Sequence, residues 1–312
     1  MIHTRKTILN LIACVALTGV LTAAHAQQTD GAFTPKLGQS GKDVIWLPTH
    51  DEVVSTMLRM AAVTSRDYVV DLGSGDGKIL IAAARDPGAR GLGLEYNPEM
   101  VELSIRRARE AGVQDKVDFR RADIFASDFS SATVVTMYLL PELNLKLRPT
   151  LFRMKPGTRI VSNSFDMGEW KPDEAAFLGT SRAMLWIIPA HVAGTWTLHH
   201  PNGTTHAPQT LNLRQRFQQL EGDVVFDQQL RYSLQNVRIK GSDIDFETRD
   251  PQGQTLHFKG RVDADRLSGE FTHARNGRSR VDARRANAPA AFDEARATDK
   301  EMAEAIRALG AQ

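Results

Sequence analysis

Three glycines separated by single polar residues have the types and spacing to bind a ligand through the backbone. They lie in Asp71-Leu-Gly-Ser-Gly-Asp-Gly77, directly after an apolar run typical of a buried strand. Glycine lets backbone approach a ligand closely because it has no Cβ. The dinucleotide pattern G-x-G-x-x-G would place its third glycine at position 78, which is Lys78, and no G-K-[ST] ending is present. Neither pyrophosphate-binding motif therefore fits.

Acidic residues follow the ends of successive predicted strands. Asp71 closes the first strand, Glu95 closes the second, and Asp123 follows the third. The carboxyl ends of parallel strands share the edge at which open α/β sheets bind ligands. Glu95 can accept from both hydroxyls of a ribose, Asp123 from an adenine amino group, and Asp71, or a water it orients, can face an ammonium group. A nucleoside with a cationic amino-acid tail and no phosphate fits this set, so the expected cofactor is S-adenosylmethionine.

The glycine loop and Gly93-Leu-Glu-Tyr-Asn-Pro98 resemble the motifs of class I, seven-strand methyltransferases, over residues 45–188. Within that superfamily, Trp46-Leu-Pro-Thr49, the loop itself and Ala132-Thr-Val-Val-Thr-Met-Tyr138 are most similar to one lysine methyltransferase family. It is the family that modifies the c subunit of ATP synthase and the adenine nucleotide translocator. The resemblance implies a Rossmann-like fold and cofactor contacts for Asp71, Gly73, Ser74, Gly75, Gly77, Glu95 and Asp123, with Pro48 and Thr49 as weaker candidates.

Methyl transfer from a sulfonium is an in-line displacement, so the enzyme mainly aligns the reacting atoms and needs no metal. A lysine acceptor, with an ordinary pKa of about 10.4, must first lose a proton. Tyr138 ends the fourth predicted strand, and Asp166 and Trp170 follow the fifth. We expect Asp166 to orient or deprotonate the acceptor while Tyr138 and Trp170 wall it. In the alternative, Trp170 packs under a second domain and Asp166 caps the following turn.

Composition limits the class of protein. The chain has 312 residues, 42% apolar and 24% charged, which predicts ordinary folded domains. Its formal net charge is only +2, and Tyr138-Leu-Leu-Pro141 stands where amide and adenine N-methyltransferases carry Asn-Pro-Pro-Tyr. Both observations argue against a nucleic-acid substrate.

Residues 1–26 have the pattern of a secretory signal. Arg5 and Lys6 precede a stretch without Asp, Glu, Lys or Arg that lasts until Asp30, and Ala-His-Ala at 24–26 fits a signal-peptidase site. An uncleaved membrane anchor is the alternative, because the apolar run is nearly long enough to span a bilayer. We expect a periplasmic or secreted protein. Cys14 is the only cysteine, so cleavage would leave a chain without disulfides, thiolate metal sites or cysteine nucleophiles.

The chain divides into two halves of different character. Residues 50–189 alternate helical and β-branched patterns, which predicts an α/β, mainly parallel sheet with helices on both faces. The predicted helices are 51–62, 78–85 and 98–111, and the predicted strands are 68–72, 91–95, 116–120, 132–138 and 158–164. Pro149 is expected to break or kink a further helix near Arg148.

Apolar and polar residues alternate with period two in residues 190–285. Gly241, Gly253, Asp265 and Gly277 fall twelve residues apart. This spacing predicts an antiparallel meander of seven or eight strands, closed into a small barrel that hides its edges. Residues 27–49 form an N-terminal segment. Residues 286–312 begin as a linker and continue as a charged helix without a strong apolar face, which we expect to be exposed or partly disordered.

Two weaker clusters lie in the second half. His199, His200 and His206 could bind a metal, although they also suit an exposed hairpin tip. Arginines near the end of this half could contact acidic lipid headgroups or an acidic protein, although the solvent face of an edge strand would explain them more simply. They are Arg275, Arg278, Arg280, Arg284 and Arg285.

Two functions compete. The first is a methyltransferase acting on a protein, on lysine, with the β-rich half presenting or selecting the substrate; a small-molecule acceptor stays open. The second is an exported binding protein of methyltransferase fold with weak or lost catalysis, whose function lies in the β-rich half. Export separates the chain from cytoplasmic S-adenosylmethionine and supports the second. Retention of Asp71, Glu95 and Asp123 favours the enzyme.

Overall fold

The computed structural model describes residues 33–38, 46–201, 207–227, 229–273, 277–287 and 298–309. The proposed signal at 1–26, His206 and Arg275 lie outside these residues. Pro35–Gln312 forms one compact unit, to which everything below belongs. In the described part of the chain, no helix has the length and apolar character needed to cross a bilayer.

A seven-stranded sheet organises the first half, in the order β3-β2-β1-β4-β5-β7-β6. Its strands are β1 (Tyr68–Leu72), β2 (Arg90–Glu95), β3 (Val117–Arg121), β4 (Val134–Met137), β5 (Arg159–Asn163), β6 (Glu174–Leu178) and β7 (Ser181–Ile187). The first five strands are parallel, whereas β7 runs antiparallel to both β5 and β6. All five predicted strands are confirmed, and the chain order reverses between β1 and β4, where such sheets open a crevice.

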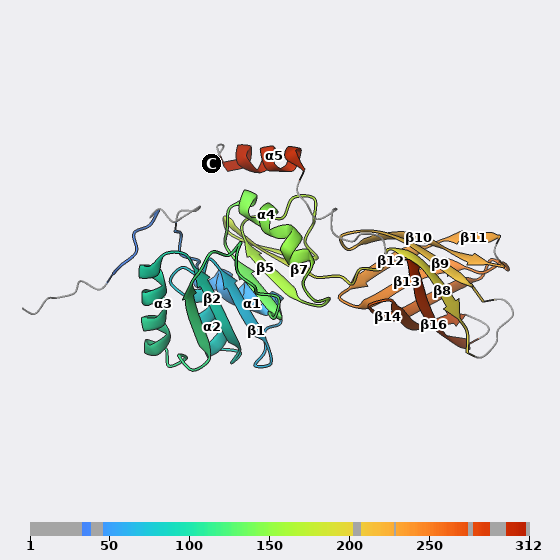
Figure 1. Ribbon diagram of the computed structural model, residues 1–312, viewed down its shortest axis with the longest axis horizontal. Coiled ribbons are helices and arrows are strands. Elements are labelled where there is room, and N and C mark those ends of the chain that lie inside the picture. The colour runs from blue at the N-terminus through green and yellow to red at the C-terminus, as the bar shows by residue number, and fades with distance from the viewer. Residues whose placement is uncertain are drawn as a thin grey trace, which may run out of the picture. The chain divides into compact units, whose positions relative to one another are not determined.

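Helices cover both faces of this sheet, which is why its central strands are continuously apolar. They are α1 (Asp51–Met60), α2 (Lys78–Arg85), α3 (Pro98–Glu110) and α4 (Pro141–Phe152), and Figure 1 shows α2 and α3 near β2. Val69 packs with α1 to α3, and the next residue, Val70, packs with α4 on the opposite face. We predicted a break or a kink near Arg148 in the helix containing Pro149, and the helix does not break there. It continues to Phe152, because burial of the last turn offsets the hydrogen bond that proline cannot make.

The second half is a nearly closed antiparallel sheet of nine strands, in the order β11-β10-β9-β8-β16-β15-β14-β13-β12. Its strands are β8 (Gly194–His199), β9 (Thr210–Arg216), β10 (Gln219–Phe226), β11 (Leu230–Ser233), β12 (Gln235–Lys240), β13 (Asp243–Arg249), β14 (Thr255–Asp263), β15 (Arg266–His273) and β16 (Gly277–Asn287). The Thr248 hydroxyl of β13 lies 3.5 Å from the Tyr232 carbonyl oxygen of β11, close to where the sheet closes. The barrel-like prediction is confirmed, with more strands than the expected seven or eight.

The arginine-rich strand β16 is not an edge strand, contrary to the simpler prediction, because it pairs with β8 on one side and β15 on the other. The side chain of its Arg285 is almost fully buried, with its guanidinium 5.0 Å from the centre of the Trp196 ring and 2.7 Å from Asp265. Arg278 stays exposed at the surface and pairs with Glu270 at 3.4 Å. The cluster therefore combines structural and surface arginines.

The C-terminal helix α5 (Asp299–Leu309) is not simply exposed, as its charged sequence led us to expect. Glu301 and Ala305 are buried, and Glu301 forms an ion pair with the fully buried Arg148 of α4. The expectation was wrong because this helix docks through one paired carboxylate as well as through apolar side chains.

Candidate functional site

The glycine loop joins β1 to α2 in a left-handed backbone conformation. Gly73, Gly75 and Gly77 have φ angles of 74°, 53° and 78°, a region that favours glycine. The Gly73 amide donates to the Leu94 carbonyl at the end of β2, at 2.8 Å. The loop is thus fixed at the carboxyl edge of the sheet, as the sequence predicts.

Residues of helix α3 bind the same loop. The Ser104 hydroxyl donates to the Gly75 carbonyl at 2.8 Å, and Arg107 forms an ion pair with Asp76. A Cβ on Gly77 would lie 2.8 Å from the Phe119 ring, so no larger residue fits there without movement. These contacts hold the loop in one shape before any ligand binds, which lowers the cost of binding.

Glu95 is positioned by backbone amides. One carboxylate oxygen accepts from the Gly75 amide and the other from the Asn97 amide, each at 2.9 Å. A carboxylate oxygen can accept more than one hydrogen bond, so both oxygens keep acceptor capacity. The half-buried Glu95 can therefore accept from a diol such as a ribose.

Asp71 is the most strongly perturbed acid of the site. Its side chain is only 2% exposed, and the Thr136 hydroxyl of β4 donates to it at 2.6 Å. Burial raises the pKa of Asp71 to about 7, with the Asp76 and Glu95 carboxylates acting in the same direction and the Thr136 hydrogen bond acting against them. A cationic ligand would favour the ionised form of Asp71.

Two aromatic residues that sequence reasoning missed lie next to the acidic pair. Tyr96 follows Glu95 and is 44% exposed, and Phe125 lies two residues after Asp123 and is 42% exposed. The Asp123 carboxylate accepts from the Phe125 amide at 2.9 Å, which forms the turn that presents this ring. Exposed rings beside carboxylates suit a purine, so these residues fit an adenosyl group. Their positions close to Glu95 and Asp123 in the sequence could have identified them as candidates.

The segment before α1 lies against the glycine loop. The Lys78 ammonium group donates to the Thr49 carbonyl at 2.9 Å, and a Cβ on Gly75 would lie 3.0 Å from the Trp46 indole nitrogen. Thr49 itself is buried, so it contributes a backbone carbonyl to the loop's support. The Ser74 hydroxyl is buried too and has no hydrogen-bond partner among the described residues.

The structure brings only part of the predicted acceptor site together. Tyr138 stacks on Phe165, with ring centres 6.2 Å apart, and Phe165 immediately precedes Asp166. One Asp166 oxygen accepts from the Gly168 amide at 3.0 Å, and the other lies 3.4 Å from Arg182. Asp166 thus caps its turn, as the alternative held, while its side chain stays partly exposed.

Trp170 does not join the acceptor site. It is fully buried, its ring stacks on Phe217 at 5.6 Å, and its carbonyl accepts from the Trp186 indole at 2.8 Å. Phe217 lies in the turn between β9 and β10. The structure therefore places Trp170 in the packing beneath the second half, where it cannot wall a ligand.

A cavity of about 440 Å³ lies beside Asp166. Its lining comes from the start of α4, the segment after β5, β7 and the C-terminal helix, namely Pro141, Leu145, Ser164, Phe165, Asp166, Gly168, Glu169, Lys171, Arg182, Thr298, Lys300, Glu301, Glu304 and Ala305. The lining therefore combines acidic and basic side chains with apolar ones.

In the part of the chain that the structure describes, no group of three or more histidine, cysteine, aspartate or glutamate side chains is placed to bind a metal ion. The His200 ring nitrogen lies 2.8 Å from the Pro208 carbonyl oxygen, and the ring stacks on Phe271. His200 is therefore used in packing.

Comparisons with known proteins agree with this geometry. The family model described as the ANTKMT methyltransferase domain matches residues 71–174. A protein-lysine N-methyltransferase of Saccharolobus islandicus is 41% identical over 133 residues, which cover 42% of this chain and 83% of that protein. The lysine N-methyltransferase of Homo sapiens that is named for the c subunit of ATP synthase is 32% identical over 173 residues, which cover 55% of this chain and 71% of that one.

A solved structure described as an RNA methyltransferase from Salinibacter ruber, in complex with S-adenosyl-L-homocysteine, is 50% identical. The aligned region covers 47% of this chain and 96% of the chain in that structure, with a TM-score of 0.46. The family match at 71–174 includes both the glycine loop and the Asp166 segment.

Proposed function

Because the chain belongs to the protein-lysine N-methyltransferase family, we propose that it transfers methyl groups from S-adenosylmethionine to lysine side chains of a protein. The observation that carries the proposal is the preformed glycine loop, to which Glu95 binds through the Gly75 amide and which directly follows the buried Asp71. Asp123 follows the neighbouring strand β3 and completes the expected set. A protein that bound only through its β-rich half would have no use for this set, so the alternative is not favoured.

The chemistry assigns distinct tasks to the residues of the site. Glu95 and Asp123 hold the ribose and the adenine, and Asp71 faces the cationic tail. When bound, S-adenosylmethionine would supply a methyl group on a positively charged sulfur: the bond between methyl carbon and sulfur would break as the lysine nitrogen bonds to the carbon, and the electron pair would stay on sulfur. Asp166 orients the acceptor and takes the ammonium proton before transfer, and the stacked Tyr138 and Phe165 rings offer aromatic faces to the cation.

Asp166→Asn is the first test of the acceptor site. We expect kcat on a lysine-containing peptide to fall by roughly a hundredfold or more, because a general base contributes about 10² to 10⁴, while the dissociation constant for S-adenosylmethionine stays unchanged. The measurement is transfer of isotope-labelled methyl from the cofactor. Asp115→Asn removes an exposed carboxylate elsewhere and serves as the matched control.

Two results would contradict the proposal. If Asp166→Asn keeps the wild-type kcat, Asp166 has no part in the acceptor site. If the enzyme transfers labelled methyl to peptides in which norleucine replaces every lysine, the acceptor is not lysine. The same conclusion follows if no label enters a peptide that contains lysine.

Export is part of the same proposal, supported by the pattern of residues 1–26. We expect the protein from its native cells to begin at Gln27, with a periplasmic or secreted location. Mass spectrometry of the N-terminal peptide checks this directly. A peptide that still contains Arg5 and Lys6 would instead favour the uncleaved anchor.

A further inference from the structure

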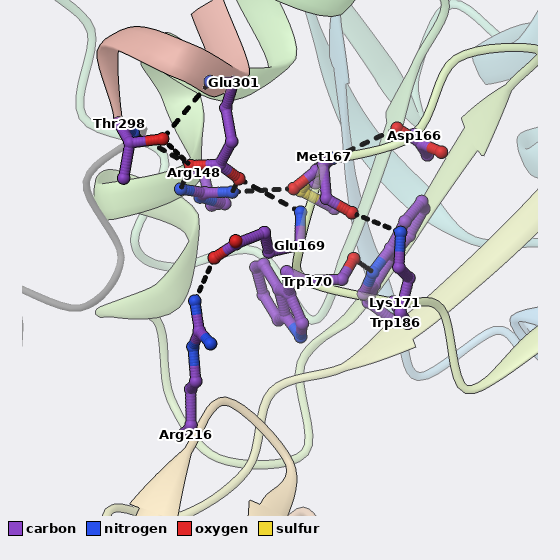
Figure 2. A network of polar contacts seen from close by, with 11 residues as sticks. Arg148, Asp166, Met167, Glu169, Trp170, Lys171, Trp186, Arg216, Thr298 and Glu301 are labelled. Carbon is purple, nitrogen blue, oxygen red and sulfur yellow. Dashed lines mark hydrogen bonds and ion pairs between the residues drawn. The ribbon is translucent and has the colours of Figure 1, made fainter.

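The C-terminal helix α5 contacts the segment that carries Asp166, although more than a hundred residues separate them in sequence. Figure 2 shows Glu301 of α5 pointing toward Arg148 and toward the backbone of this segment. The Glu301 carboxylate lies 2.6 Å from one Arg148 nitrogen and accepts from the Glu169 amide at 3.0 Å. A single side chain of α5 thus binds both α4 and the acceptor loop, which we define as residues 164–171.

Glu301 is held in its charged form. Although burial acts in the opposite direction, hydrogen bonds from the Arg148 side chain and from the Thr298 and Glu169 amides lower the pKa of Glu301 to about 2. The residue just before its own helix supplies part of this support, because the Thr298 amide donates to it at 2.8 Å. The ion pair therefore persists over the whole working range of pH.

The acceptor loop is bound through its backbone from the other side as well. The Asn144 side-chain amide donates to the carbonyls of Phe165 at 3.0 Å and Asp166 at 3.2 Å. Arg148 donates to the Met167 carbonyl at 2.8 Å. Helix α4 thus fixes the carbonyls of the loop, and Glu301 fixes one of its amides while neutralising Arg148.

Gly168 gives the loop a shape that matches α5. Its φ angle is +65°, and a Cβ at this position would lie 2.7 Å from a Glu301 carboxylate oxygen and 3.0 Å from Leu145. Any side chain at residue 168 would therefore compete with Glu301 for the same space. The same Gly168 amide donates to Asp166, so the turn that α5 contacts is also the turn that orients Asp166.

The cavity beside Asp166 is shared by these two segments. Thr298, Lys300, Glu301, Glu304 and Ala305 of α5 and the residue before it line the cavity, and Phe165 and Asp166 of the acceptor loop line it as well. We propose that α5 forms a wall of the acceptor-binding cavity and that Glu301 is a positioning residue, which holds the acceptor loop so that Asp166 faces the incoming lysine. This inference rests on the proposed lysine methylation.

Glu301→Gln in the full chain tests the inference. The amide keeps the size of the side chain but loses the charge, so Arg148 and the Glu169 amide are no longer held by one carboxylate. We expect kcat on a lysine peptide to fall by roughly tenfold or more, since small misplacements of a reacting group have effects of this size. The dissociation constant for S-adenosylmethionine should not change, because Asp71, Glu95 and Asp123 lie on other segments.

Two further variants separate positioning from loss of folding. Asp299→Asn removes an exposed carboxylate of the same helix and should keep the wild-type kcat. Gly168→Ala leaves Glu301 intact but displaces its carboxylate, so it should lower kcat as Glu301→Gln does. All kcat values are measured at one temperature, about 15 °C below the lowest thermal midpoint among the variants, so that the folded state is compared in every case.

The outcomes distinguish the inference from the function on which it rests. A wild-type chain that binds the cofactor but methylates no lysine peptide overturns the proposed function and the inference together. Wild-type activity combined with an unchanged kcat in Glu301→Gln and Gly168→Ala overturns the inference alone. If Glu301→Gln does not fold, Gly168→Ala decides: an unchanged kcat in that variant overturns the inference, and a lowered kcat with unchanged cofactor affinity supports it.

Discussion

Replacing Glu95 by alanine should weaken the binding of S-adenosylmethionine by more than about a hundredfold. Two hydrogen bonds from ribose hydroxyls to a carboxylate contribute about 1.5 to 3 kcal/mol each, and 1.4 kcal/mol corresponds to a factor of ten in affinity. The substitution also frees the Gly75 and Asn97 amides that Glu95 now binds at 2.9 Å, so the loop loses part of its fixed shape. Isothermal titration of the wild-type and variant chains with the cofactor gives both dissociation constants.

Glu99→Ala is the matched control for this experiment. Glu99 is an exposed carboxylate in the first turn of α3, four residues further along the chain, and it should not affect the dissociation constant. Glu95→Gln should fall between the two, because it keeps an acceptor oxygen but loses the charge. Equal affinity in Glu95→Ala and the wild type would exclude Glu95 from the cofactor site, and no binding by the wild type would exclude the enzyme itself.

Asp71→Asn should change stability and binding in opposite directions. Because burial raises the pKa of Asp71 to about 7, the folded chain holds a proton between about pH 4 and 7 that the unfolded chain releases. The ionised carboxylate therefore destabilises the fold increasingly over this range and fully above pH 7. We expect Asp71→Asn to raise the free energy of unfolding of the ligand-free protein at pH 8 by on the order of 2 kcal/mol, measured by urea denaturation.

The same substitution removes a negative charge that faces the cationic tail of the cofactor. Affinity for S-adenosylmethionine at pH 8 should fall by roughly a hundredfold, since hydrogen bonds to charged groups contribute about 1.5 to 3 kcal/mol. Wild-type affinity should also decline as the pH falls below 7, whereas the affinity of Asp71→Asn should vary much less. A wild-type affinity that is independent of pH from 6 to 8 would show that ionised Asp71 does not contact the cofactor.

Local sequence patterns predicted the parallel strands and the position of the glycine loop at their carboxyl edge because each signal is complete within a short segment. Asp71 and the glycines need only one strand-to-helix turn, and Glu95 needs only the end of the next strand. The motif resemblance then supplied their roles. Boundaries of the strands shifted by no more than two residues, as expected where frayed ends are decided by neighbouring chains.

The misplaced residues depend on contacts between distant segments. Trp170 is a plausible aromatic wall by its position after β5, and only the stacking of Phe217 from the second half makes it part of the core. Charged Glu301 looks like a surface residue until Arg148 is placed beside it, 153 residues away. The arginine-rich sequence of β16 looks like that of an edge strand, because nothing in this segment reveals that β8 pairs with it. No local pattern encodes such partners.

The stacked rings of Trp170 and Phe217 also bear on how this gene could have changed. Phe217 belongs to the same buried cluster as Trp186 and Phe152, so the apolar interior of the first half extends past residue 189 into the second. A shortened gene ending at 189 would encode a product without Phe217, so the Trp170 ring would lose this cover and be exposed to water, which favours self-association. Deletion of the β-rich half would therefore not be neutral as a single mutation. Substitutions that remove the exposed apolar surface around Trp170 would have to come first.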